Sequence, residues 1–213
     1  MFIFFIFGTR CNSFIIVIVH FFHIWYMMQF VGADMNKAAD CGGTPLGEAA
    51  RGGHEAVVKV LIAAGANVND VNKADNNGDT PLQLAVMNDH EAVVKLLIAA
   101  GADVNKAEDY PTPLQIAVAN DHEAVVKLLI AAGADVNKAD NFGETPLGEA
   151  VMNDHEAVVK ALIAAGADVN DVNKADNNGD TPLKWAVMND YEAVVKALIA
   201  AVADVNKASL GII

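Results

Sequence analysis

The chain is 213 residues long and carries a formal net charge of −13. Arg10 is the only charged residue before Gly32, so the remainder carries −14. This acidity excludes nucleic acid as a partner, because phosphates require a basic surface, and it favours a partner protein with a basic or apolar surface. The two cysteines, Cys11 and Cys41, form neither a disulfide framework nor a zinc motif, which favours a cytoplasmic location.

The first 31 residues are strongly hydrophobic. Residues 14–31 contain 15 apolar residues in 18, slightly short of the roughly 20 that span a bilayer. One interpretation is a membrane-tethered repeat protein in which this N-terminal hydrophobic segment sets the location, with membrane association through residues 1–31. The other interpretation limits the possible anchor, or appended sequence, to residues 1–20.

The rest of the chain is a repeat. Thr-Pro-Leu occurs five times, and each copy leads with constant spacing into Glu-Ala-Val-Val-Lys and then Ala-Asp-Val-Asn or a near variant. A unit of this size cannot bury its own apolar faces, so neighbouring units must stack around one continuous core. We divide the chain into five units and a tail, which span residues 40–74, 75–107, 108–139, 140–175, 176–208 and 209–213.

Each unit predicts two short helices and a turn-rich connector. In the second unit Thr80 is a suitable N-cap, Pro81 suits the first helical position, and Gln83 completes a capping box. The second helix is expected near residues 91–100, with Gly101 as the residue that ends it. The Asn-Gly pair in the connector before the first helix predicts a hairpin turn.

Several positions depart from this pattern. Gly47 and Gly148 replace the capping-box glutamine, so the first helices of units one and four should be less stable by about 1 kcal/mol. Glu48 and Glu149 are interpreted as carboxylates turned toward the positive helix end rather than buried ones. Val202 stands where the closing glycine of unit five belongs.

A longer period contains the short one. Thr44 and Thr145 are 101 residues apart, and so are Thr80 and Thr181. Unit four therefore repeats unit one and unit five repeats unit two, which indicates that a block of three units was copied whole.

The junction between the two helices of a unit has its own residues. Asn88 and Asp89 tolerate left-handed geometry and are expected to cap the second helix. Histidines occupy the next position in four units, and Tyr191 occupies it in the fifth. Packed helices lie about 10 Å apart, too far for successive side chains to share a metal ion. We therefore interpret these histidines as bridges between units: His54, His90, His122 and His155.

No residue pattern in the sequence suits catalysis. The acidic residues between Asp70 and Asp79 do not match an EF-hand, which leaves a solvated turn. A Ser/His/Asp or Cys/His set and a phosphate-binding glycine loop are both missing from the sequence. We expect a protein that is not an enzyme and that needs no cofactor and no metal.

The pattern D-x-x-G-x-T-P-L…H-E-A-V-V-K-L-L-I-A-A-G-A-D-V-N resembles the ankyrin repeat over residues 40–208. The resemblance implies an all-α fold, an ankyrin-type helix-turn-helix solenoid with β-hairpin loop tips. It also implies a non-catalytic protein–protein interaction module that binds its partner on a concave face formed by these tips and the first helices. The variable positions of the family give the candidate partner-binding residues: Asn76, Asn77, Asp79, Met87, Asn88, Tyr110, Asn141, Phe142, Glu144, Met152, Asn153, Asn177, Asn178, Asp180, Met188 and Asn189.

The repeat can be continued backward into the hydrophobic N-terminus. Counting from Gly32, Ile24 and Trp25 fall at the core positions that two valines occupy in later units. We therefore interpret residues 21–39 as a degenerate half repeat that covers unit one.

Overall fold

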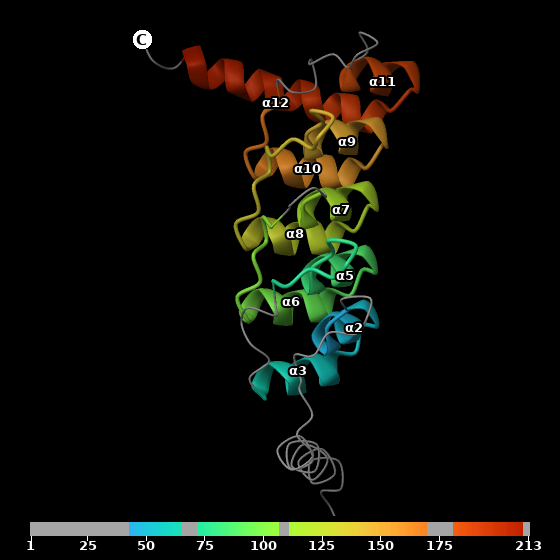
Figure 1. Ribbon diagram of the computed structural model, residues 1–213. Coiled ribbons are helices and arrows are strands. Elements are labelled where there is room, and N and C mark those ends of the chain that lie inside the picture. Colours follow the sequence, from blue (N-terminus) through green and yellow to red (C-terminus); the bar gives the residue numbers. More distant parts are fainter. Residues whose placement is uncertain (1–42, 65–71, 107–110, 170–180, 211–213) are drawn as a thin grey trace, which may run out of the picture.

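The computed structural model describes residues 43–64, 72–106, 111–169 and 181–210. Within these residues the chain forms ten helices and no strand, arranged as five helix pairs that stack into one column (Figure 1). The predicted all-α repeat solenoid is thereby confirmed.

Each unit supplies a first helix of seven residues, and the second helix has nine residues in units one to four. The pairs are α2 (Pro45–Arg51) with α3 (Glu55–Ala63), α5 (Pro81–Met87) with α6 (Glu91–Ala99), α7 (Pro113–Ala119) with α8 (Glu123–Ala131), α9 (Pro146–Met152) with α10 (Glu156–Ala164), and α11 (Pro182–Met188) with α12 (Glu192–Leu210).

The first helices begin as the Thr-Pro pairs predict. The Thr80 hydroxyl accepts a hydrogen bond from the Gln83 backbone N–H, and the Gln83 side chain accepts one from the Thr80 N–H at 2.8 Å. α7 has the same capping box. In α2 and α9 a glycine supplies its N–H to the threonine but has no side chain to return the bond. The predicted difference in capping is confirmed.

The junction between the helices works differently from our prediction. Asp89 has a φ of 54°, and the aspartates at this position in units three to five are also left-handed. However, the second helices have no side-chain N-cap bond, and the Asn88 amide donates back to the Leu84 carbonyl at 2.8 Å. The prediction that these two residues cap the second helix was wrong. The backbone turn itself satisfies the Glu91 N–H, which donates to the Asp89 carbonyl at 3.0 Å.

Glycine decides where a second helix ends. Gly101, Gly133 and Gly166 have φ values of 90°, 89° and 88°, a conformation that ends a helix at little cost only for glycine. Unit five has Val202 at this position instead of glycine, and its second helix, α12, is 19 residues long.

One hydrophobic core runs through all five units. Val58, Val94, Val126 and Val159 occupy the same position in successive second helices, and all four are fully buried. Burying such a side chain contributes about 1.5–3 kcal/mol, so the stability of each unit depends on its neighbours.

The described connector tips, before α5 and α9, are tight turns, and no strand among the described residues flanks them, so the β-hairpin tips that we expected are not confirmed. The Asp75 N–H donates to the Asp79 carbonyl at 3.0 Å, and the Asp75 carboxylate accepts the N–H of Asn77 at 2.8 Å. Asp140 closes the equivalent turn before α9 with the Glu144 carbonyl at 2.9 Å. The interpretation of the acidic connector as a turn is confirmed.

No helix in the described ranges is long and apolar enough to cross a membrane. Residues 1–20 and 21–39, which carry the predicted anchor and half repeat, lie outside those ranges.

Candidate functional site

The first helices lie along one side of the column and the second helices along the other (Figure 1). The candidate residues that the structure describes lie on the connector tips and at the ends of the first helices. Asp79 and Met152 are half-buried. Tyr110, Asn177, Asn178 and Asp180 lie outside the described residues. The other candidates are exposed: Asn76, Asn77, Met87, Asn88, Asn141, Phe142, Glu144, Asn153, Met188 and Asn189.

The tip before α9 presents an apolar side chain to solvent. Phe142 is 91% exposed. The turn that carries it is closed by the Asp140 carboxylate, which accepts the N–H of Phe142 at 2.8 Å and that of Glu144 at 2.9 Å. A hydrogen-bonded turn therefore holds the phenylalanine outward, at the position that Asn77 occupies in unit two.

Negative charge is concentrated around these tips. Burial raises the pKa of Asp79, the nearby Asp75 raises it further, and Arg51 opposes the shift. The Arg51 guanidinium of unit one lies 3.1 Å from the Asp75 carboxylate of unit two, and the two groups form an ion pair across the junction.

The two copied glutamates differ. Glu48 is exposed and lies 4.0 Å from the Arg51 guanidinium. Glu149 is half-buried, and its pKa is raised by burial first and then by Glu144 and Asp140, while His155 lowers it. Our interpretation of both as unburied carboxylates therefore fits Glu48 but was wrong for Glu149.

His90, His122 and His155 bridge neighbouring units, as we expected, whereas His54 is exposed and makes no such contact with the described residues. One ring nitrogen of His90 lies 3.1 Å from the Arg51 carbonyl of the preceding first helix. His122 uses its other ring nitrogen, Nδ1, which lies 2.9 Å from the Val86 carbonyl, and His155 makes the equivalent contact with the Val118 carbonyl. No group of three or more potential metal ligands occurs within the residues that the structure describes.

A second set of bridges was missed in the sequence. The Asn72 side chain accepts the N–H of Asp103 in the next connector at 2.7 Å, and Asn105 accepts that of Asp135 at 2.8 Å. Asn137 repeats the contact. The signal was present, because an asparagine recurs at this position of each unit. These bonds fix the register of successive tips.

The second helices present a different surface. Each carries a Glu–Lys ion pair one helical turn apart, and the side chains are about half exposed or more. Such pairs contribute only about 0.3–0.5 kcal/mol each, so this side of the column is a solvated surface.

Residues 18–108 and 114–209 match the family model for ankyrin repeats in three copies, and residues 87–130 match a second ankyrin repeat model. The chain belongs to the ankyrin repeat family. Ankyrin repeats are generally protein–protein interaction modules, and the family is typically non-catalytic. No curated protein matches this ankyrin repeat chain.

Proposed function

We propose that this ankyrin repeat chain is a non-catalytic cytoplasmic module that binds another protein on the concave face of the array, through the connector tips and the first helices. The observation that carries the proposal is Phe142. A phenylalanine that is 91% exposed on a hydrogen-bonded turn contributes little packing to the fold. Aromatic side chains that become buried on binding are frequent energetic centres of interfaces.

The chemistry of the surface suggests the partner. Asp140 and Glu144 place carboxylates beside Phe142, and Asp79 adds another at the tip before α5, which favours a partner that combines basic and apolar groups. Met87, Met152 and Met188 recur at the ends of first helices, and methionine adapts its shape to the partner.

The rigidity of the surface also supports binding. The asparagine and histidine bridges hold successive units in fixed register. A preorganised surface loses little conformational entropy when a partner docks, so a modest set of contacts is sufficient for affinity.

Affinity capture from cell extract with cross-linking mass spectrometry tests the proposal on the full chain. We expect cross-links at the tips and first helices. Phe142→Asn, which restores the residue found in unit two, should lower recovery of the cross-linked partner at least about tenfold. The control is Lys95→Ala on the outer side of α6. If both variants recover the partner equally, or both lose it equally, the concave face is not the binding site.

The membrane-tethered alternative concerns residues 1–31. Flotation of the full chain with phosphatidylcholine vesicles tests it separately. Quantitative flotation would assign that segment to the membrane whatever the tips bind.

A further inference from the structure

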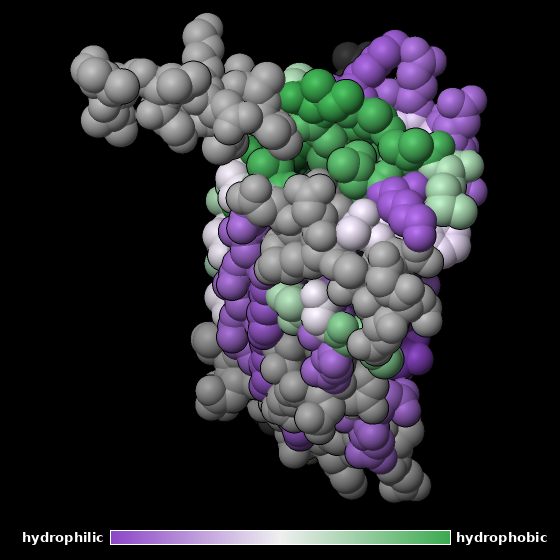
Figure 2. All heavy atoms as spheres, turned by 90° about the horizontal axis from the view of Figure 1, so that it is seen from above, coloured by the Kyte–Doolittle hydropathy of each residue, from purple (hydrophilic) through white to green (hydrophobic). Residues whose placement is uncertain are grey.

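The end of the column formed by α11 and α12 exposes apolar surface. Figure 2 looks down on this end and shows hydrophobic side chains gathered there. Val187 is 62% exposed and Ile199 is 63% exposed. We call Leu183, Val187, Val195 and Ile199 the end face, because each is more exposed than its counterparts in the interior units.

In the interior units the positions that correspond to the end face are buried or half-buried between neighbouring units. Val86, Val118 and Val151 correspond to Val187, and each is fully buried. There α7 packs on α5 and α8 on α6, and His122 reaches the Val86 carbonyl. The end face is therefore an inter-repeat surface that no described residue covers.

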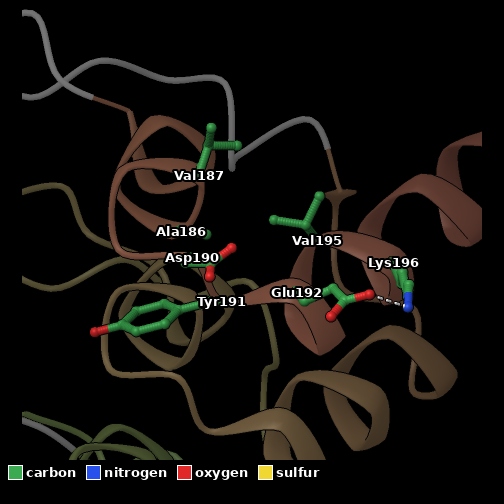
Figure 3. A pocket seen from close by; sticks show the side chains of 7 residues that line it. All are labelled: Ala186, Val187, Asp190, Tyr191, Glu192, Val195 and Lys196. Atoms are coloured by element: carbon green, nitrogen blue, oxygen red, sulfur yellow. Dashed lines mark hydrogen bonds and ion pairs between the residues drawn. The ribbon is translucent and has the colours of Figure 1, made fainter.

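A depression of about 300 Å³ lies between the two helices. Figure 3 shows Val187 of α11 and Val195 of α12 on opposite sides of it, with the Glu192–Lys196 ion pair beside it. Tyr191 lines the depression at the position where the interior units carry a bridging histidine.

The end face carries different polar groups from the surface that unit two presents to unit three. In unit two the Gln83 side chain donates to the Pro111 carbonyl of the next unit at 2.9 Å. Unit five has Lys184 in place of the glutamine, and the backbone of α12 continues through Val202 instead of ending before a connector.

The formal charge of unit five indicates which molecule binds to the end face. The formal charge can be summed in each unit from the start of the first helix to the lysine of the second helix. Over this span units two, three and four each carry a net negative charge. Unit five is neutral over this span, with Lys184 and Lys196 opposing Asp190 and Glu192. Two copies of a −13 chain repel each other least at a neutral surface. A surface with both signs can also pair with itself.

We propose that the end face binds a second copy of this chain, with the two end faces against each other around a two-fold axis. Closed two-fold dimers are the commonest homo-oligomers, and they use the same patch on both subunits. The contact would bury four aliphatic side chains and half-buried Tyr191 from each copy, and it would leave the tips and Phe142 open for another protein.

Sedimentation equilibrium of the full chain from about 1 to 100 µM tests the proposal. We expect a dimer that Val187→Asp weakens at least about a hundredfold. Val57→Asp is the matched control, because Val57 is 48% exposed on α3 in unit one, which is also neutral from its first helix to the lysine of its second helix. Circular dichroism checks that both variants fold, and Ile199→Asp replaces Val187→Asp if that variant does not fold.

Three results would overturn the proposal. The first is a wild-type monomer at 100 µM, and the second is an unchanged dimer in folded Val187→Asp. The third is a pair of results: Val57→Asp no longer associates with itself, and it forms a one-to-one complex when it is mixed with Val187→Asp. That pattern requires head-to-tail stacking. A dimer of Val57→Asp that does not incorporate Val187→Asp supports the two-fold arrangement.

Discussion

Units two and five are copies of one another, 101 residues apart, yet the same side chains lie in different environments. Val86 of unit two is fully buried, whereas Val187 of unit five is 62% exposed. The helices that carry them have the same length and begin with the same Thr-Pro pair. In a stacked array, burial is therefore a property of the neighbouring unit and not of the unit's own sequence.

This difference has an energetic consequence. A side chain in unit two contributes to a junction that the next unit closes, while its copy in unit five, among the described residues, contributes to contacts within unit five and with unit four. Matched substitutions in the two copies should therefore have unequal effects.

The largest effect is expected from a charge in the core. Val86→Asp places an unpaired carboxylate in a fully buried position and should lower the free energy of unfolding by about 3–5 kcal/mol. Val187→Asp should change it by less than about 0.5 kcal/mol. Urea unfolding near 1 µM, below the range in which dimers matter, measures both. Equal losses would contradict the comparison.

A smaller effect is expected at the capping position. Gln83→Ala removes one half of a capping box and the bond to the Pro111 carbonyl, and should cost about 1–3 kcal/mol. Lys184→Ala, the matched change in unit five, should cost less than about 0.5 kcal/mol, because Lys184 is exposed and closes no capping box. The shift in urea midpoint reports both, and a larger shift for Lys184→Ala would count against this account.

A third pair of matched substitutions concerns the histidine bridges. His122→Ala removes the inter-unit bond to the Val86 carbonyl, which keeps only backbone partners within its own unit such as the Asp89 N–H, and should cost about 1 kcal/mol. His54 is exposed and contacts no described carbonyl of another unit, so His54→Ala should cost less than half as much. Thermal unfolding of the two variants in parallel checks this. Similar losses would mean that the bridges are not what stabilises the junctions.

The smallest effect concerns pH and the copied glutamates. Burial raises the folded-state pKa of Glu149 above its ordinary value of 4.5, so folding favours the neutral carboxyl. That contribution is present below pH 4.5 and is lost as the pH rises through the folded pKa. Glu149→Gln should remove this loss and flatten the stability profile between pH 4 and 8. Glu48→Gln is the exposed control, and an equal flattening there would contradict the assignment.

The repeat pattern alone determined the helices and most of their boundaries. Thr80 with Gln83 starts a helix and Gly101 ends one through contacts that reach only three to five residues along the chain. Such local rules can be read from sequence. Because they repeat in phase five times, they also specified the stacked architecture and the family.

The candidate surface could be predicted in part. The resemblance supplied the positions, and most of those described are exposed. The outward position of Phe142 depended on the Asp140 turn, and the prediction that Asp89 caps a helix failed because the backbone turn satisfied the same N–H groups.

Only the tertiary structure decided what depends on a neighbouring unit. It showed that Asn72 and its copies bridge successive connectors, that Glu149 is half-buried while Glu48 is exposed, and that the end face is open. The physical reason is that none of the three depends only on the few residues that flank it in the sequence. The asparagine bridges join residues about 30 positions apart, and units that are copies of one another acquire different environments according to what surrounds them.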